Sequence, residues 1–214
     1  MAKIRILLAD DHTVVRRGLR RILESDPMVE IVGEAGDGRA AVESAARLKP
    51  GVAIVDISLP ELNGVEVTRQ LAKAAPDTKV LILSMHADQA YIRQCLHAGA
   101  KGYLLKDADD EDLLKAVSAL HAGGSYFSPT VSRIVLDGYL HDAPPIADEL
   151  AVLSDREREV LQLIAEGKSN KEVAQVLDVA VSTVESHRKH VMEKLDLHNT
   201  AEMVRFALRK GMIQ

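Results

Sequence analysis

The stretch Val52-Ala53-Ile54-Val55-Asp56-Ile57-Ser58-Leu59-Pro60 contains an apolar run that leads directly into one carboxylate. Pro50 and Gly51 bound this run on one side, and Pro60 bounds it on the other. A short apolar run between such breakers is typical of a buried strand in a parallel sheet. Asp56 is then expected at the carboxyl end of a central strand, where open α/β sheets bind their ligands.

Apolar runs and helical patterns alternate on both sides of this stretch. The other expected strands are 4–9, 31–33, 80–83 and 102–105, and the expected helices are 13–25, 37–48, 64–74, 88–98 and 109–122. Alternation of five strands with five helices requires a parallel sheet with helices on both faces. Residues 1–122 are therefore predicted to form one α/β domain with a five-stranded parallel sheet.

Polar residues follow four of the five expected strands. They are Asp10 and Asp11 after the first strand, Asp56 after the third, Ser84 after the fourth and Lys106 after the fifth. Because parallel strands end at one edge of a sheet, these groups are expected to share one crevice. Three carboxylates repel one another unless a cation joins them, and oxygen ligands of this kind suit Mg²⁺. The set indicates a site for a phosphoryl group, with Asp56 as the nucleophile.

A phosphatase that forms an aspartyl-phosphate, of the haloacid dehalogenase type, also uses an Asp at a strand end. It needs a second carboxylate two residues further on as general acid, and Ser58 occupies that position here. The sequence has no Gly-x-x-x-x-Gly-Lys-Ser/Thr loop for cradling phosphates. These observations leave the phosphatase as the less favoured alternative.

The strand-end residues, together with Lys101-Gly-Tyr-Leu-Leu-Lys106, resemble the receiver domain of bacterial two-component response regulators over roughly residues 1–122. The resemblance implies a flavodoxin-like fold in which Asp56 accepts the phosphoryl group. It implies that Mg²⁺ is held by Asp10, Asp11, Asp56 and the backbone carbonyl of Ser58.

The same resemblance implies a switch around the acceptor. Ser84 is expected to be the switch hydroxyl, Lys106 the cation that binds the phosphoryl group, and Tyr103 the aromatic that turns inward on activation. Ser84 replaces the more frequent Thr and keeps the hydroxyl group.

Breakers separate the first domain from the rest of the chain. Gly123-Gly124 and Ser128-Pro129 follow the last expected helix, and Asp142-Ala143-Pro144-Pro145 interrupts the chain again. Between them, residues 130–141 carry apolar residues at helical spacing. Residues 123–150 are therefore predicted to be a linker that contains one short helix.

Residues 151–214 show only helical patterns. Four expected helix starts pair a capping residue with a Glu three positions later, namely Ser154/Glu157, Ser169/Glu172, Ser182/Glu185 and Asn199/Glu202. The second and third helices are joined by residues 178–181, which is the short connection of a helix-turn-helix. This part of the chain is predicted to be an all-α domain of four helices.

The third of these helices exposes a run of basic and polar residues around inward-facing Val184, Val191 and Leu195. Cations at helical spacing can contact DNA phosphates, and the second helix of a helix-turn-helix motif typically lies in the major groove. The chain as a whole has a formal net charge of −5, so a DNA-binding surface has to be local. A phosphorylation-independent adaptor, whose basic helix binds protein, is the alternative on charge alone.

Three segments resemble the LuxR-type helix-turn-helix: Leu153-Ser-Asp-Arg-Glu-Arg-Glu-Val-Leu, Gly167-Lys-Ser-Asn-Lys-Glu-Val-Ala and Ser182-Thr-Val-Glu-Ser-His. The whole chain is similar to the NarL/FixJ class of response regulators. That similarity implies DNA contacts from Lys171, Thr183, Glu185, Ser186, Arg188 and Lys189. Glu185 departs from the Lys often found there. It is expected either to take part in the helix cap or to accept a hydrogen bond from the N4 group of a cytosine.

The sequence therefore predicts a cytoplasmic transcription factor controlled by phosphorylation, and not an enzyme in the ordinary sense. A sensor histidine kinase is the expected phosphoryl donor, and double-stranded DNA is the expected ligand of the second domain. The single Cys95 suits a reducing compartment, and no apolar run reaches the length of a membrane span. Apolar residues 203, 204 and 206–208 cover more than one face of the last helix, which predicts a homodimer that forms on two DNA half-sites when the chain is phosphorylated.

Overall fold

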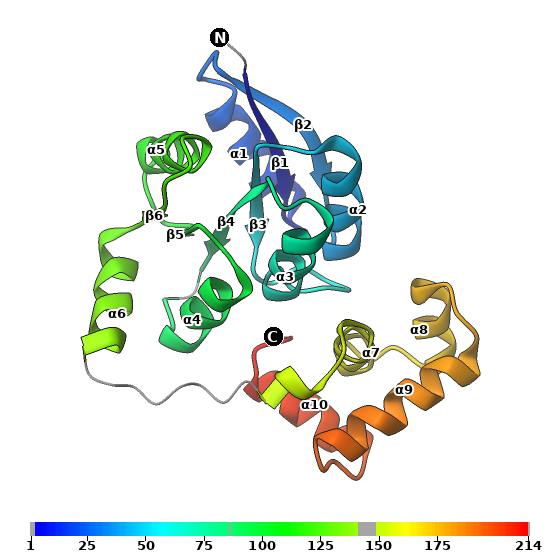
Figure 1. Cartoon of the computed structure of the whole chain (residues 1–214). Coiled ribbons are helices and arrows are strands. Elements are labelled where there is room, and N and C mark those ends of the chain that lie inside the picture. The colour runs from blue at the N-terminus through cyan, green and yellow to red at the C-terminus, as the bar shows by residue number, and fades with distance from the viewer. Residues whose placement is uncertain (1–2, 86, 141–148, 214) are drawn as a thin grey trace. The chain divides into compact units, whose positions relative to one another are not determined.

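The computed structural model describes residues 3–85, 87–140 and 149–213, so residues 141–148 of the expected linker lie outside the described ranges. The chain separates into two compact units, residues 1–144 and 145–214. Figure 1 labels the elements of both units. Within the described ranges, every helix is too short or too polar to cross a lipid bilayer.

The first unit contains a parallel sheet with the strand order β2-β1-β3-β4-β5-β6. The strands are β1 Ile4–Ala9, β2 Val29–Ala35, β3 Val52–Asp56, β4 Lys79–Ser84, β5 Gly102–Leu105 and β6 Tyr126–Phe127. The helices are α1 Thr13–Leu23, α2 Gly38–Leu48, α3 Gly64–Ala74, α4 Gln89–Ala98, α5 Asp110–His121 and α6 Pro129–Leu140. The predicted α/β architecture with a parallel sheet is confirmed.

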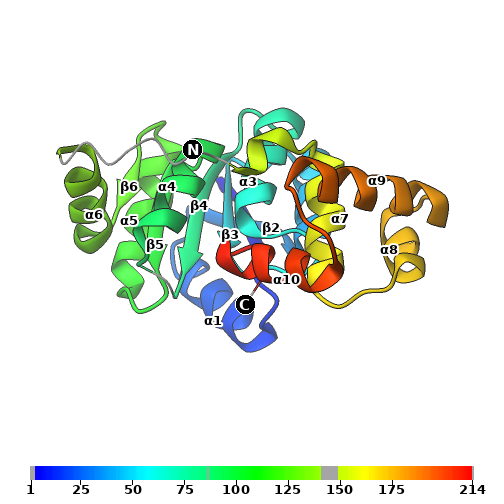
Figure 2. The same ribbon diagram turned by 90° about the horizontal axis from the view of Figure 1, so that it is seen from below.

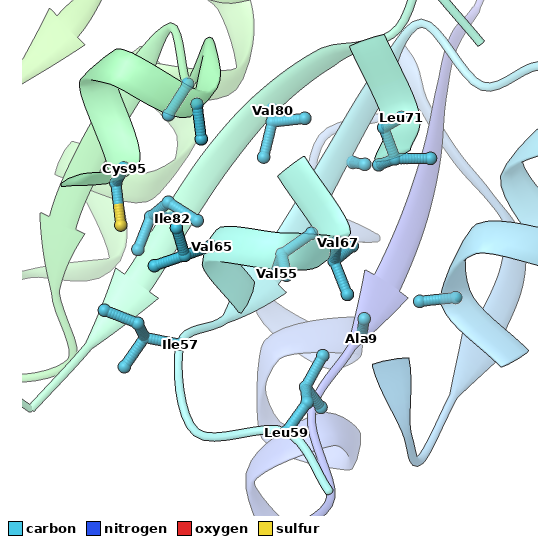
Figure 3. Packing of buried hydrophobic residues seen from close by; sticks show 14 of the residues in the cluster. Ala9, Val55, Ile57, Leu59, Val65, Val67, Leu71, Val80, Ile82 and Cys95 are labelled. Carbon is cyan, nitrogen blue, oxygen red and sulfur yellow. The ribbon is translucent and has the colours of Figure 1, made fainter. Parts of the chain in front are cut away.

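Alternate residues of the buried strands pack on opposite faces of this sheet. Ala53 and Val55 of β3 belong to a core with α2, α3 and α4, whereas Val52 and Ile54 belong to a core with α1 and α5. Figure 3 shows the first of these cores, in which side chains such as Val55 and Ile82 meet α3 and α4. The central strand is buried on both faces, as the continuous apolar run predicted.

The sheet has six strands, so the prediction of five is wrong by one edge strand. Gly123 has a φ of +85°, and the Gly124 N–H donates to the carbonyl of Ala119, so the chain turns back at the end of α5. Tyr126 and Phe127 then pair with Gly102 and Tyr103 of β5. A two-residue strand is too short to show an alternating pattern in the sequence.

Helix α6 was expected within the linker and is present, but it packs on the core of the first unit. Val131 is fully buried in the core that includes β4, β5 and α4, and Ile134 and Val135 pack against the same core. The predicted limits 1–122, 123–150 and 151–214 remain predictions. In the structure, the described residues 123–140 belong to the first compact unit.

The second unit consists of helices. They are the 3-10 turn η1 Glu149–Val152, α7 Asp155–Ala165, α8 Asn170–Leu177, α9 Val181–Lys194 and α10 Thr200–Arg209. A separate apolar core joins them, with Leu161 and Ile164 of α7, Val173 of α8, Val184 and Val191 of α9 and Phe206 of α10. The four α-helices agree with the predicted all-α domain.

The capping residues fix where these helices begin. Ser154/Glu157 and Ser169/Glu172 form reciprocal capping boxes, as predicted. Asn199 accepts the N–H of Glu202 at 2.9 Å, while the Glu202 carboxylate accepts the N–H of His198 at 2.7 Å.

The predicted capping box Ser182/Glu185 is wrong. Helix α9 begins at Val181, one residue before Ser182, and its cap position is Ala180, which forms no side-chain capping bond. The packing of Val181 and Val184 on the core places the start of the helix ahead of the Ser-x-x-Glu pattern.

Candidate phosphoacceptor site and recognition helix

The ends of β1, β3 and β5 bring two carboxylates and one ammonium group together. Asp10 and Asp56 are 2% and 4% exposed. The Nζ atom of Lys106 lies 2.7 Å from Asp10 Oδ2 and 2.8 Å from Asp56 Oδ2. The other oxygen of Asp10, Oδ1, accepts the backbone N–H of His12 at 2.8 Å. The structure therefore brings Asp10, Asp56 and Lys106 together, as expected from the strand ends.

The Lys106 ammonium is held in its charged form by its two partners. Burial lowers the pKa of Lys106, but the hydrogen bonds to Asp10 and Asp56 outweigh this effect and leave the pKa above its usual value. Removing two carboxylates and a cation from water is costly unless they pair with good geometry. The pairing explains how two buried acidic groups coexist at this edge of the sheet.

The acidic groups also form a candidate metal site. Ligand atoms of Asp10, Asp11, His12 and Asp56 all lie within 4.8 Å of one another. Carboxylate oxygens from two strand ends are the ligands that Mg²⁺ prefers, so the residues fit that ion.

His12 was not predicted as a member of this group. Its exposed imidazole lies 2.7 Å from Asp11 Oδ1, and its position next to Asp10-Asp11 in the sequence is the only signal that marks it. The carbonyl of Ser58, in the turn that follows β3, remains a predicted ligand.

Ser84 and Tyr103 lie beside each other in the interior. Both side chains are fully buried, and their hydroxyl groups share a hydrogen bond. Burial raises the pKa of Tyr103 well above its usual value, and the hydrogen bond with Ser84 offsets only part of that rise. The backbone N–H of Lys106 donates to the carbonyl of Ser84 at 2.8 Å. Tyr103 thus occupies the inward position in this structure.

Gly64 permits α3 to begin directly against the end of β3. Its N–H donates to the Ile57 carbonyl at 2.9 Å. A Cβ atom at this position would lie 2.5 Å from the Asp56 carbonyl oxygen, which no side chain tolerates without movement of the backbone. The glycine therefore contributes to the position of Asp56, a role that no pattern in the sequence indicates.

Helices α8 and α9 form the predicted helix-turn-helix. Asp178 ends α8 in the left-handed conformation, with a φ of 51°, and α9 begins three residues later. Val184 and Val191 are fully buried, so they fix which face of α9 turns toward the core. Of the predicted DNA contacts, Lys171, Glu185, Ser186 and Lys189 are exposed, whereas Thr183 and Arg188 are half-buried.

Arg188 is engaged within its own domain. Its Nη1 atom donates to Asn170 Oδ1 at 3.3 Å, and its Nη2 atom donates to the hydroxyl of Thr200. Asn170 and Thr200 are the first residues of α8 and α10, so Arg188 connects three helices. The same three residues, with Lys168, Ser169 and Lys171, line a hollow of about 410 Å³. Sequence patterns alone did not indicate this bridging role.

The predicted DNA-contact residues Ser186, Lys189 and Glu185 differ in their local bonds. The hydroxyl of Ser186 donates to the Ser182 carbonyl at 3.0 Å, and Lys189 lies 3.6 Å from Glu193 on the next turn. Glu185 is the fifth residue of α9 and takes no part in its cap, so the capping alternative for this residue is wrong. The contact of Glu185 with a cytosine N4 group in DNA remains a prediction.

The fold and the two sites define a two-component response regulator with a helix-turn-helix output domain. The family model of the response regulator receiver domain matches residues 6–118, and that of the luxR family of bacterial regulatory proteins matches residues 151–207. The chain belongs to the response regulators that combine these two domains, the NarL/FixJ class. It is a phosphorylation-dependent transcriptional regulator.

Relatives match over nearly the whole chain. The oxygen regulatory protein NreC of Staphylococcus carnosus is 40% identical over 215 residues, which cover 98% of this chain and 99% of that protein. RcsB from Salmonella enterica serovar Typhimurium, solved with promoter DNA and the phosphomimetic BeF₃⁻, is 29% identical with a TM-score of 0.62. That match covers 98% of this chain and 99% of RcsB. A structure of two RcsB dimers on two parallel DNAs has a TM-score of 0.60 at 29% identity, and covers 96% of this chain and 98% of that one.

Proposed function

We propose that Asp56 accepts a phosphoryl group from a sensor histidine kinase, and that this modification controls the binding of α9 to DNA. The observation that carries the proposal is the buried Asp56 carboxylate with the Lys106 ammonium 2.8 Å away and Asp10 on the other side of that ammonium. A carboxylate beside a fixed cation is suited to attack phosphorus, because the cation can stabilise the charge on the transferred oxygens.

In the proposed reaction, a carboxylate oxygen of Asp56 forms a bond to the phosphorus of the kinase phosphohistidine. The P–N bond breaks, and the imidazole of the kinase leaves with the electron pair. Asp10, Asp11, Asp56 and the carbonyl of Ser58 would hold Mg²⁺, which when bound stabilises charge on the phosphoryl oxygens. Because this transfer consumes the acceptor instead of turning over a separate substrate, the chain acts as a regulator and not as an ordinary enzyme.

Lys106, Ser84 and Tyr103 are proposed to sense the modification. The phosphoryl group adds about −1.5 to −2 charges and three acceptor oxygens. The ammonium of Lys106 would then turn from the Asp56 carboxylate to a phosphoryl oxygen, and the Ser84 hydroxyl would donate to another. Ser84 shares its hydrogen bond with Tyr103, so a new partner for Ser84 changes the environment of Tyr103.

The exposed face of the helix-turn-helix is proposed to bind double-stranded DNA. Lys171 and Lys189 suit phosphate oxygens, while Thr183, Glu185 and Ser186 suit base edges in the major groove. The bonds of Arg188 to Asn170 and Thr200 favour a role in positioning α8 and α10 for these contacts.

We also propose a cytoplasmic homodimer on two half-sites. Met203, Phe206 and Ala207 are buried in the core of the domain, whereas Val204 is half-buried and Leu208 is 47% exposed. The last two are therefore the apolar residues of α10 best suited to pair with a second copy.

The acceptor assignment is tested by incubating the full chain with Mg²⁺ and acetyl phosphate and measuring the intact mass. Wild type is expected to gain one acid-labile phosphoryl group, and Asp56→Asn is expected to gain none. Asp110→Asn, which changes an exposed carboxylate on α5, serves as the matched control and should be modified like wild type. Equal modification of Asp56→Asn and wild type would show that another residue is the acceptor.

A further inference from the structure

A second group of potential metal ligands lies in the DNA-binding domain. His187 and His190 are one turn apart on α9, and Glu157 lies opposite them on α7. One ligand atom from each of the three side chains lies within 4.8 Å of the other two. Figures 1 and 2 both show α7 and α9 side by side, and the two helices share a core through Val160 and Val191.

The carboxylate of Glu157 is fixed before any ion binds. It is 4% exposed, and its Oε2 atom accepts the backbone N–H of Ser154 at 2.8 Å and the Ser154 hydroxyl at 3.0 Å. Burial raises the pKa of Glu157, but the hydrogen bonds from Lys194 and Ser154 outweigh it and hold the pKa below its usual value. The group is therefore ionised at neutral pH and held in one orientation.

The two imidazoles face this carboxylate without strong partners of their own. The Nδ1 atom of His190 lies 3.9 Å from Glu157 Oε1, too far for a hydrogen bond. Within the described part of the chain, neither His187 nor His190 forms a side-chain hydrogen bond. Neutral imidazoles are the commonest metal ligands among side chains, and the exposed position of His190 leaves a path for an ion from solvent.

We propose that Glu157, His187 and His190 bind a divalent transition-metal ion, with Zn²⁺ as the best match, and that the ion connects α7 to the recognition helix. Two imidazoles and one carboxylate are a known zinc ligand set that leaves a fourth position for water. The donor set differs from the oxygen-rich crevice at Asp10 and Asp56, which suits Mg²⁺. The domain thus carries a metal site separate from the phosphoryl chemistry.

Lys194 competes with the ion for the same carboxylate. Its Nζ atom lies 2.9 Å from Oε1 and 2.7 Å from Oε2 of Glu157. Its side chain is 41% exposed, so the ammonium can move into solvent when an ion arrives. A positive charge at this distance opposes a divalent cation, so removing the charge of Lys194 strengthens metal binding.

The ligands are tested by titrating the full chain with ZnCl₂ in a calorimeter, with excess Mg²⁺ present to occupy the receiver crevice. His187→Asn and His190→Asn are each expected to weaken Zn²⁺ binding by about tenfold or more. His198→Asn changes an exposed histidine of the same domain that lies outside the group, and should bind like wild type. Binding that neither His187→Asn nor His190→Asn weakens would overturn the proposal.

Lys194→Met tests the same site in the opposite direction. It is expected to tighten Zn²⁺ binding several-fold. The double variant Lys194→Met/His190→Asn should lose the gain. Unchanged or weaker binding by Lys194→Met would contradict a site built on the Glu157 carboxylate.

Discussion

Lys106 is the residue on which the acidic crevice depends. Asp10 and Asp56 are both almost fully buried, and the same ammonium group forms an ion pair with each of them. Sequence reasoning could place these residues together, because parallel strands end at one edge. The sequence does not show that Lys106 bridges the two carboxylates, since that bridge depends on side-chain geometry.

Replacing Lys106 by Met should leave two buried carboxylates without a cation. Breaking a buried ion pair by removing one partner costs about 3–5 kcal/mol, so the free energy of unfolding is expected to fall by about that amount without Mg²⁺. Added Mg²⁺ should restore more stability to this variant than to wild type, because an ion that binds only the folded state stabilises it.

Urea denaturation with and without Mg²⁺ measures both effects. Lys101→Met removes an exposed cation ahead of the same strand and is the matched control. If Lys106→Met is no less stable than Lys101→Met, the ammonium group does not hold the crevice together.

Lys189 and Arg188 are neighbours in sequence but are expected to act differently. Lys189 is 75% exposed, so Lys189→Ala should leave stability unchanged and reduce the slope of log affinity against log salt by about 0.9. Arg188 bonds to Asn170 and Thr200, so Arg188→Ala should lower the free energy of unfolding by about 2 kcal/mol.

DNA titrations at several salt concentrations and urea melts of both variants separate these roles. Lys115→Ala, which removes an exposed cation of α5, controls for a general change in charge. A salt slope for Lys189→Ala that equals the control would remove Lys189 from the phosphate contacts.

At the scale of the helices and strands, the sequence predicted the elements that carry a regular apolar or capping pattern. It did not predict the features that depend on tertiary packing. Apolar runs between breakers and reciprocal Ser-x-x-Glu pairs predicted the central strands and the starts of α7 and α8. The strand β6 has two residues and no pattern of its own, so it exists only because β5 offers an edge. The start of α9 follows the burial of Val184 and not the Ser182/Glu185 pattern.

The attachment of α6 to the first unit can be tested with one buried and one exposed residue of that helix. Val131 is fully buried in the receiver core, so Val131→Ala should lower the free energy of unfolding of the full chain by about 2 kcal/mol. Leu136 is 58% exposed on the same helix, and Leu136→Ala should have little effect. Similar small changes in both urea melts would mean that α6 is not part of that core.

At the scale of the whole molecule, two units serve two tasks. The receiver unit has a parallel sheet whose strand ends gather charged groups, and the helical unit has a core that presents α9. Strand β6 pairs beside Tyr103, and Val131 of α6 lies in the same core as Tyr103, so under the proposed mechanism we expect a change at Ser84 and Tyr103 to alter the packing of β6 and α6. Coupling between a phosphoryl group and DNA binding is then a linkage between two sites of one chain.

Control of DNA binding through Asp56 is tested most directly by the DNA affinity of the full chain at one fixed salt concentration, with and without acetyl phosphate and Mg²⁺. DNA fragments recovered from genomic DNA by binding to the protein serve as the ligand, and fluorescence anisotropy gives the affinity. Wild type is expected to bind about 5- to 150-fold more tightly after modification, the usual range for coupled sites, whereas Asp56→Asn is expected to show no change. Equal affinity of wild type in both conditions, or an equal response of Asp56→Asn, would contradict control of DNA binding through Asp56.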